Sequence, residues 1–251
     1  MIDEVTMNAR KPREDEYGLA MLNRMNHHHK ELHRWALEHV SLDTDHTILD
    51  VGFGGGQNIH NLLHLTHDSK VWGIDYSPAS YRKCEELNHE AVAEGRQELT
   101  IGSADDLPYY HDFFDLVTAF ETIYYWPNIE KCFRGIYDCM RHNGRFLICN
   151  EDSSAAGNAE LIEALHLDYY SCEDLERLLK EAGFRTVHTY THHNGKWICA
   201  VATKYHPEHK HTGRAPCRQG RVLFWHSALK KDTRGIPVLR LPFLPVDILP
   251  R

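Results

Sequence analysis

The chain lacks several features that would set it apart from ordinary globular proteins. None of its apolar runs approaches the roughly eighteen residues that a membrane-spanning helix needs. Its first residues include Asp3 and Glu4 and no apolar stretch, so we expect no secretory signal. The formal net charge is −8, which argues against a basic surface that holds nucleic-acid phosphates. These absences favour a small molecule over nucleic acid or a membrane as the ligand.

Cysteine pairs of the C-x-x-C type are also missing. The seven cysteines are an odd number, which favours reduced thiols over a disulfide framework. We therefore expect a cytoplasmic protein. A length of 251 residues suits one α/β domain with a substantial core and is too short for two large domains.

An apolar strand that runs directly into a glycine loop is the most informative segment. The strand covers residues 47–51, and glycines follow at positions 52, 54, 55 and 56. Glycine permits a tight turn and a close approach to a ligand, because it has no Cβ, and the helix that follows offers unpaired N–H groups. About twenty residues on, a second apolar strand ends at Asp75, where a carboxylate can accept hydrogen bonds from a ribose. These segments predict a nucleoside pocket.

Signals for strands and helices alternate along most of the chain. The expected strands are 47–51, 71–75, 99–102, 115–120 and 144–150, and the expected helices between them are 57–66, 78–94 and 129–141. Before them, apolar residues at mostly helical spacing over 18–40 predict one long helix or two short ones. This alternation indicates a parallel sheet with helical crossovers.

A helix and a hairpin are expected further along. A capping signal at Ser171 begins the helix, and Gly183 is placed to end it. Apolar segments at 184–190 and 197–203 flank Asn194-Gly195, a pair typical of tight hairpin turns.

Five segments, in order, resemble the motifs of class I S-adenosylmethionine (SAM) dependent methyltransferases. Asp50-Val-Gly-Phe-Gly-Gly-Gly56 resembles their D/E-x-G-x-G-x-G motif, and Gly73-Ile-Asp-Tyr-Ser-Pro78 resembles the second motif. The other three segments are 102–109, 114–120 and 143–148. The resemblance covers roughly residues 17 to 204 and looks closest to a small-molecule branch that includes quinone-biosynthesis and arsenite methyltransferases. A dinucleotide-dependent dehydrogenase is disfavoured, because Gln57 stands where G-x-G-x-x-G has its last glycine.

This resemblance implies a fold and a cofactor. The fold class would be α/β, with a Rossmann-like, seven-stranded, mostly parallel sheet, an antiparallel C-terminal hairpin and helices on both faces. SAM would bind at the carboxyl ends of the strands. The cofactor-binding residues that the resemblance implies are Asp50, Gly52, Gly54, Gly56, Asp75, Tyr76, Ser103, Ala104, Asp105 and Phe120.

The implied roles of these residues differ. Asp75 would bind the ribose hydroxyls and Tyr76 would pack on the adenine. Asp50 either orders the glycine loop or meets the methionine ammonium through water. Ser103 departs from the family pattern, since many relatives have an aspartate there that accepts from the adenine amino group. Either Asp105 takes over this contact, or the adenine relies on nearby backbone groups.

Residues after the fourth strand should face the transferred methyl group. Glu121 is a candidate general base, and an acid that orients the loop or binds the methionine ammonium is the favoured alternative. Three aromatic side chains either line the acceptor pocket or simply pack beneath a helix: Tyr124, Tyr125 and Trp126. Tyr17 and Met25, on the N-terminal helices, are expected to form the opposing wall.

Histidine is frequent, with 20 residues. The pairs His29/His33 and His60/His64 have the i, i+4 spacing that places two zinc ligands on one helix face. Neither pair has an acidic or cysteine partner at a recognisable spacing, so we expect no metal site. The favoured interpretation is that most histidines are solvated polar residues. The alternative is that His27 or His29 is a general base, because the ordinary histidine pKa of about 6.5 suits that task.

The chain changes character near its end. From residue 206 the sequence mixes basic residues with histidines, loses periodicity and finishes with closely spaced prolines. We expect an N-terminal helical lid at 1–45, a SAM-binding methyltransferase domain at 46–204 and an irregular, disordered tail at 205–251. A partner-binding arm and a sequence introduced by a cloning or reading-frame accident are the alternatives for the tail.

The predicted function is in-line transfer of a methyl group from SAM to a small-molecule acceptor. The alternative is a SAM-binding sensor or scaffold without catalysis. The expected partners include neither nucleic acid nor a membrane, and the choice between monomer and homodimer stays open. The sequence does not identify the acceptor.

Overall fold

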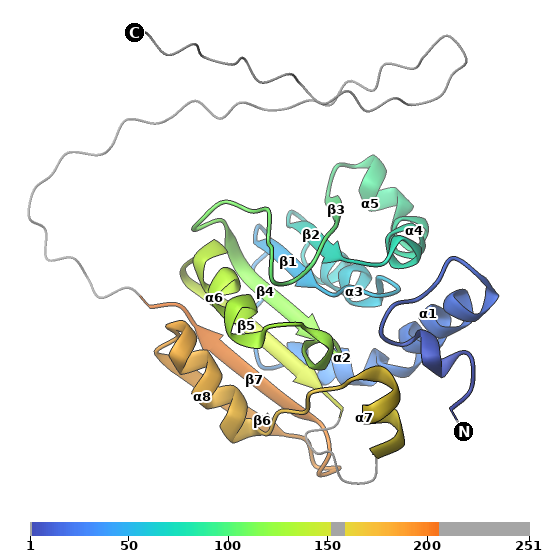
Figure 1. The fold of residues 1–251 in the computed structure, drawn as a ribbon. Coiled ribbons are helices and arrows are strands. Elements are labelled where there is room, and N and C mark those ends of the chain that lie inside the picture. The colour runs from blue at the N-terminus through green and yellow to red at the C-terminus, as the bar shows by residue number, and fades with distance from the viewer. Residues whose placement is uncertain (1, 152–158, 206–251) are drawn as a thin grey trace, which may run out of the picture. The chain divides into compact units, whose positions relative to one another are not determined.

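The centre of the computed structural model, which describes residues 2–151 and 159–205, is a seven-stranded sheet (Figure 1). The strand order is β3-β2-β1-β4-β5-β7-β6. The strands are β1 (Thr47–Val51), β2 (Lys70–Asp75), β3 (Gln97–Ile101), β4 (Phe114–Phe120), β5 (Met140–Asn150), β6 (Thr186–Thr191) and β7 (Ile198–Thr203). The order reverses between β1 and β4, which is where sheets of this kind bind ligands.

The first five strands pair in parallel, and β7 runs antiparallel to both of its neighbours, β5 and β6. The predicted fold class is therefore confirmed: a Rossmann-like, mostly parallel sheet closed by an antiparallel hairpin. The hairpin turns where Asn194-Gly195 predicts, because Gly195 takes a positive φ of 71°.

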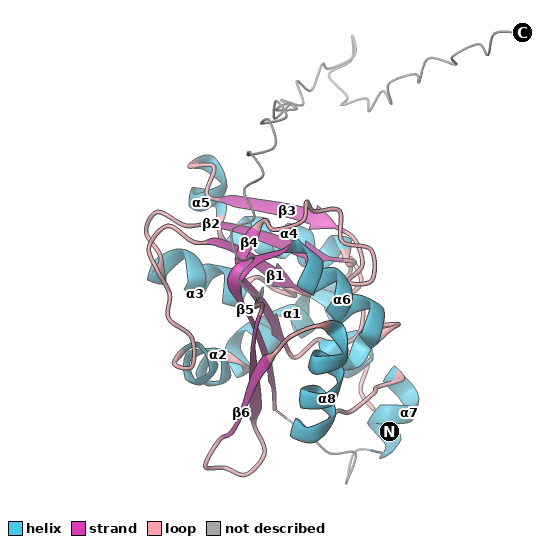
Figure 2. Cartoon of the chain, turned by 90° about the vertical axis from the view of Figure 1, so that its left-hand side faces the viewer, coloured by secondary structure: helices cyan, strands magenta, loops and turns pink. Residues whose placement is uncertain are grey.

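Eight α-helices are described. They are α1 (Glu16–His28), α2 (Lys30–Leu37), α3 (Gln57–Leu65), α4 (Pro78–Leu87), α5 (His89–Ala93), α6 (Ile129–Cys139), α7 (Ala159–Leu165) and α8 (Cys172–Ala182), with short 3-10 helices η1 (Thr6–Asn8) and η2 (Ile123–Tyr125). Figure 2 shows α2 and α3 on one side of the sheet and α6 and α8 on the other.

Two apolar cores fill the two sides of the sheet. One packs Phe133 of α6 and Leu179 of α8 against the strands, and the other packs Leu32 of α2 and Ile59 of α3 against the opposite face. Each of these four side chains is fully buried. Burial of one such side chain stabilises the fold by about 1.5–3 kcal/mol, so the sheet is a rigid support for its loops.

The N-terminal region forms two short helices, which is one of the two predicted arrangements. Asp15 caps α1, since its side chain accepts a hydrogen bond from the backbone N–H of Gly18. The helix ends at His28, because the next residue, His29, has a ψ of 5° that departs from the helical range, and α2 begins directly afterwards.

The single helix expected over 78–94 is in fact two helices, so that prediction is wrong in detail. The break lies at Asn88, which is buried and whose side-chain amide donates to the carbonyl of Cys84 at 3.2 Å. A side chain that bonds its own backbone in this way competes with helix continuation.

Other boundaries also differ from the sequence pattern. Strand β5 begins at Met140, four residues before the expected start. The strand continues through Asn143-Gly144 and includes the residues before this pair. Helix α7 was not predicted. The predicted cap of α8 is confirmed, because Ser171 and Asp174 form a reciprocal capping box.

No helix within the described residues is long and apolar enough to cross a membrane. The six cysteines in the described part of the chain are free thiols. The tail expected from residue 206 onward lies outside the described residues, so its predicted irregularity stays a prediction.

Candidate active site

The glycine loop between β1 and α3 is held by the carboxylate at the end of β2. Asp75 accepts hydrogen bonds from the backbone N–H groups of Gly54 and Ser77, each at 2.9 Å. Gly56 has a φ of 84°, and a Cβ there would lie 2.5 Å from the sulfur of Cys84. The chain therefore requires glycine at this position both for its backbone angle and for space.

Asp50, at the end of β1, is buried beneath the loop. Its Oδ1 accepts from Thr118 Oγ1 at 2.6 Å and from Asn58 Nδ2 at 3.0 Å. Burial raises the pKa of Asp50 to about 6 despite these two bonds. Burial likewise raises the pKa of Asp75 to about 6. Both carboxylates thus gain a proton at a higher pH than an exposed aspartate.

A cavity of about 440 Å³ opens in front of this loop. Its walls come from the glycine loop, from the end of β4 and from helices α1, α2 and α7. The residues that line it include Arg10, Met21, Met25, His29, His33, Asn58, Phe120, Glu121, Tyr124, Tyr125 and Leu165. Figure 1 shows α1 and α7 beside the end of the sheet to which β4 and β5 point.

A second cavity of about 220 Å³ adjoins the first. The two share Gly52, Asp75, Tyr76 and Tyr125 as walls. Only the smaller one is lined by the residues after β3, including Ser103 and Ala104. The carboxyl ends of β1, β2, β3 and β4 are thus brought together, as the strand-end rule predicts.

Asp105 is not a wall of either cavity. Its Oδ1 accepts from Ser103 Oγ at 2.5 Å, and its Oδ2 lies 3.5 Å from Lys131 Nζ. The hydrogen bond from Ser103 lowers the pKa of Asp105. Of the two alternatives for the adenine edge, this placement favours the backbone near Ala104.

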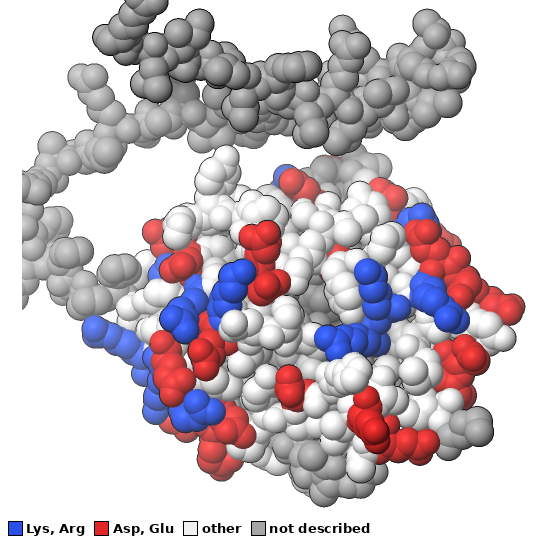
Figure 3. Space-filling view, viewed as in Figure 1, with Lys and Arg blue, Asp and Glu red and all other residues white. Residues whose placement is uncertain are grey.

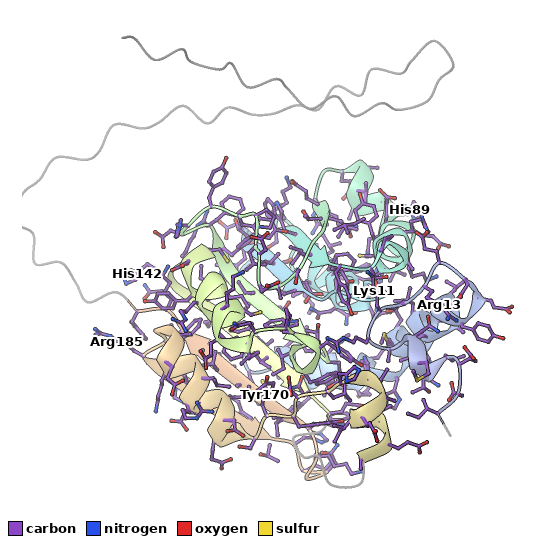
Figure 4. The ribbon with its side chains drawn as sticks, viewed as in Figure 1. Lys11, Arg13, His89, His142, Tyr170 and Arg185 are labelled. Atoms are coloured by element: carbon purple, nitrogen blue, oxygen red, sulfur yellow. The ribbon has the colours of Figure 1, made fainter. Side chains whose placement is uncertain are left out.

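The segment before α1 closes one side of the site. The hydroxyl of Tyr76 donates to the carbonyl of Arg10, and Ser77 Oγ donates to the carbonyl of Pro12 at 2.8 Å. Lys11, labelled with Arg13 in Figure 4, holds its Nζ 5.3 Å from the centre of the Tyr76 ring. Further along, Asn26 Nδ2 donates to the carbonyl of Gly55 at 2.9 Å, which attaches α1 to the glycine loop.

Glu121 follows β4 in a left-handed conformation with φ of 53°, which is uncommon outside glycine. Its Oε2 accepts from the hydroxyl of Tyr124 at 2.8 Å, and its Oε1 accepts from the backbone N–H of Glu151. Tyr124 in turn packs against the rings of Tyr125 and Tyr169. The loop after β4 is therefore rigidly held against the end of β5.

The structure corrects the argument for His29 as a general base. Burial, with a smaller contribution from His28, lowers the pKa of His29 to about 4. A group with this pKa is a poor proton acceptor at neutral pH, so the reasoning from an ordinary histidine pKa was wrong. His29 does line the larger cavity.

Two residues expected in the acceptor pocket lie elsewhere. Tyr17 is 39% exposed and its ring lies beside Arg13, outside the walls of the larger cavity. Trp126 is 6% exposed, donates through Nε1 to Thr122 Oγ1 at 3.2 Å, and borders only the smaller cavity. Tyr17 therefore faces outward on α1. Most of the Trp126 ring packs in the protein interior, which is the alternative given for it above.

Several residues of the site were missed by reasoning from the sequence. Glu151 directly follows β5, so the strand-end rule that collected the other residues would have found it. Asn58 carries a buried Oδ1 without a partner among the described residues, and it lines the larger cavity. Arg10 lines both cavities, but it precedes the first helix and carries no recognisable motif.

On the face that Figure 3 shows, basic and acidic side chains are interspersed, so neither sign of charge dominates. This face carries no continuous basic patch of the kind that binds nucleic acid.

Residues 42–200, which are more than half of the chain, match the family described as Methyltransferase domain. The chain belongs to this family. Together with the fold, the membership shows a class I SAM-dependent methyltransferase domain whose cofactor is SAM. The resemblance in the sequence motifs is thereby confirmed.

Two curated relatives illustrate the family. The chain is 28% identical over 115 residues to the erythromycin 3''-O-methyltransferase of Saccharopolyspora erythraea, a match that covers 46% of this chain and 38% of that protein. It is 29% identical over 97 residues to a chloroplastic 2-methyl-6-phytyl-1,4-hydroquinone methyltransferase of Oryza sativa, covering 39% of this chain and 28% of the relative. The matches thus span less than half of each of these relatives.

Among solved structures, the fold is similar to that of phosphoethanolamine N-methyltransferase 2 of Haemonchus contortus in complex with phosphomonomethylethanolamine and S-adenosylhomocysteine. The TM-score is 0.67 at 14% identity, over 82% of this chain and 61% of the other. At this identity the similarity concerns the fold alone.

The residues of this methyltransferase domain fit SAM. The loop approaches the cavity through glycines, and a Cβ at Gly52 would lie 2.1 Å from Thr122 Oγ1. The unpartnered Oδ1 of Asn58 is an acceptor that an ammonium group in the cavity would satisfy.

Proposed function

We propose that this chain transfers a methyl group from SAM to a small-molecule acceptor by in-line displacement. The observation that supports this proposal most directly is the pair of adjoining cavities, which share walls at the glycine loop and at Asp75. The smaller cavity suits the adenine end of SAM. The larger one has room for the methionine end and for an acceptor beside it, since pockets for small ligands commonly measure about 300–1,000 Å³.

The proposed cofactor contacts follow from these positions. Asp75 accepts from the ribose hydroxyls, Tyr76 packs on the adenine, and the backbone near Ser103 and Ala104 meets the adenine edge. Asp50 supports the loop through Asn58, whose free Oδ1 is proposed to accept from the methionine ammonium. These roles agree with where each side chain lies.

The acceptor is proposed to lie between the N-terminal helices and the loop after β4. Met21 and Met25 form an apolar wall from α1, and Leu165 of α7 adds to it. Tyr124 and Tyr125 also line this cavity and pack in the same apolar cluster as Met21 and Leu165. Residues 1–45 would thus serve as a lid over the domain at 46–204, and the acceptor would be partly apolar.

The reaction mainly requires that the acceptor be aligned with the methyl group of SAM. SAM supplies a methyl group on a sulfonium, which is already a good leaving group. The protein holds the acceptor in line with it and excludes water, and positioning of this kind can contribute about 7–11 kcal/mol. Glu121 is proposed to order the loop through Tyr124, because its two carboxylate oxygens accept hydrogen bonds from Tyr124 and from the backbone N–H of Glu151.

The two relatives support a small acceptor, since they methylate erythromycin and 2-methyl-6-phytyl-1,4-hydroquinone. We propose a cytoplasmic location, which the free thiols of the described cysteines support.

The hydroxyl of Tyr124 offers a sharp test. Tyr124→Phe should raise the acceptor KM or lower kcat by about tenfold and leave the Kd for SAM within about threefold, because one hydrogen bond to a carboxylate is worth about 1.5–3 kcal/mol. Steady-state kinetics with SAM calorimetry measures both. Tyr110→Phe, at an exposed tyrosine, is the matched control. Equal loss of SAM affinity would move Tyr124 from the acceptor wall to the cofactor site.

A further inference from the structure

Three side chains with metal-binding atoms meet beside the larger cavity. His29, Glu121 and Glu151 each offer one ligand atom, and the three atoms lie within 4.8 Å of one another. They come from the junction of α1 with α2, from the end of β4 and from the end of β5. Because these segments are far apart in the sequence, ligand spacing along the chain could not reveal the cluster.

We propose that His29, Glu121 and Glu151 bind a divalent first-row metal ion, Mn²⁺ or Zn²⁺, which holds an oxygen atom of the methyl acceptor.

The donor set suits such an ion. One imidazole nitrogen and two carboxylate oxygens match ions that accept both nitrogen and oxygen ligands. Donor atoms lie about 2.0–2.2 Å from such an ion, so no two ligand atoms of one ion are more than about 4.4 Å apart. The three side chains therefore have to draw slightly closer together than the observed 4.8 Å to bind it.

The ligands are also oriented by their neighbours. Tyr124 donates to Oε2 of Glu121 at 2.8 Å, and the backbone N–H of Glu151 donates to Oε1 of Glu121. His28 Nε2 lies 3.1 Å from Oε2 of Glu151. Groups of this kind, which hold the ligands in place, are a regular feature of metal sites.

A second observation points to a polar ligand in the same cavity. His33 is 5% exposed, lines the cavity one helical turn after His29, and its Nδ1 has no partner among the described residues. The centres of the two rings are 6.2 Å apart. A buried ring nitrogen without a partner is unfavourable, and water bound to a nearby ion would satisfy it.

The charge of the cluster also favours a cation. Two carboxylates whose ligand atoms lie within 4.8 Å of one another repel each other. The neighbour His28 is 64% exposed, so solvent weakens its electrostatic influence on the cluster. A divalent ion would offset the two negative charges directly.

Such an ion would define the class of acceptor, and this part rests on the proposed function. Three protein ligands leave positions open toward the cavity. A hydroxyl or phenol oxygen bound there loses its proton to solvent more readily, which removes the need for a basic side chain. That oxygen then forms a bond to the methyl carbon while the carbon–sulfur bond breaks and sulfur keeps the electron pair.

The test uses the full, untagged chain, stripped with a chelator, and Mn²⁺ alone as the probe. Electron paramagnetic resonance of free Mn²⁺ gives stoichiometry and affinity, and Zn²⁺ is added as a competitor. We expect one Mn²⁺ per chain, displaced by Zn²⁺, with affinity at least tenfold weaker in Glu151→Gln and in His29→Ala. His64→Ala is the matched control, because His64 is an exposed member of the other histidine pair, and its affinity should equal that of the parent.

Melting temperature and SAM calorimetry confirm that each variant folds, and Glu121→Gln replaces any variant that does not. Equal Mn²⁺ affinity in parent and ligand variants would mean adventitious binding to other histidines and would overturn the proposal. Absence of Mn²⁺ and Zn²⁺ binding below millimolar concentration would overturn it too. Because neither SAM nor acceptor is present, both results leave the proposed methyl transfer untouched.

Discussion

At the scale of single residues, two buried aspartates dominate the electrostatics of the cofactor site. Asp50 and Asp75 sit at the ends of neighbouring strands, and burial raises the pKa of each to about 6. Their sequence positions were readable from the strand–loop pattern. Their raised pKa values were not, because burial depends on which helices cover the loop.

These pKa values give SAM binding a defined pH dependence. The ionised carboxylates accept hydrogen bonds and attract the positive groups of SAM, so protonation as the pH falls through about 6 should weaken binding. If only the ionised form binds, Kd rises about tenfold per carboxylate between pH 7 and pH 5, one unit below the pKa. Calorimetry over this range measures the change. Asp50→Asn should show a shallower slope, and a flat profile in the parent would mean that neither charge acts on SAM.

Glycine positions provide a second residue-scale prediction. Gly56 and Gly95 both have positive φ, of 84° and 72°, but a Cβ meets Cys84 only at Gly56 and meets nothing within 4 Å at Gly95. Gly95→Ala should cost only the backbone strain, about 1–2 kcal/mol. Gly56→Ala should cost about 1–3 kcal/mol more, because of overpacking, and should also abolish SAM binding. Urea denaturation compares them, and equal losses would contradict the close fit of the loop against α4.

At the scale of elements, the N-terminal helices and α7 form walls of the larger cavity. The apolar periodicity of 18–40 predicted helices there, but it did not indicate which face looks inward. Tyr17 illustrates the limit, since it shares α1 with Met21 yet lies on the outer surface. Nor was the helix break at Asn88 readable, because it depends on a side-chain contact formed only after folding.

The two faces of α1 can be compared directly. Met21 lines the cavity, whereas Leu19 is 48% exposed on the same helix. Met21→Ala should raise the acceptor KM about tenfold, equivalent to about 1.4 kcal/mol of lost apolar contact, and change SAM affinity little. Leu19→Ala should change neither quantity. Steady-state kinetics tests this, and an unchanged KM in Met21→Ala would show that α1 does not contact the acceptor.

At the scale of the whole molecule, the sequence predicts the fold well because the motifs at the carboxyl ends of the strands follow one topology. The sheet order then brings Asp50, Asp75 and Glu121 to one edge, as parallel strands require. Glu151 escaped this reasoning because the strand-end rule was applied only to the first four strands. Its approach to His29 depends on how α1 and α2 lie over the sheet, which no local pattern encodes.

The most direct test of the central claim measures S-adenosylhomocysteine formed from SAM by the purified chain in the presence of fractionated small metabolites. We expect formation well above the level without acceptor, in a small and partly apolar fraction, and strongly reduced formation in Tyr124→Ala at saturating SAM. If the chain binds SAM by calorimetry yet forms no S-adenosylhomocysteine with any fraction, methyl transfer is contradicted and a SAM-binding sensor or scaffold takes its place.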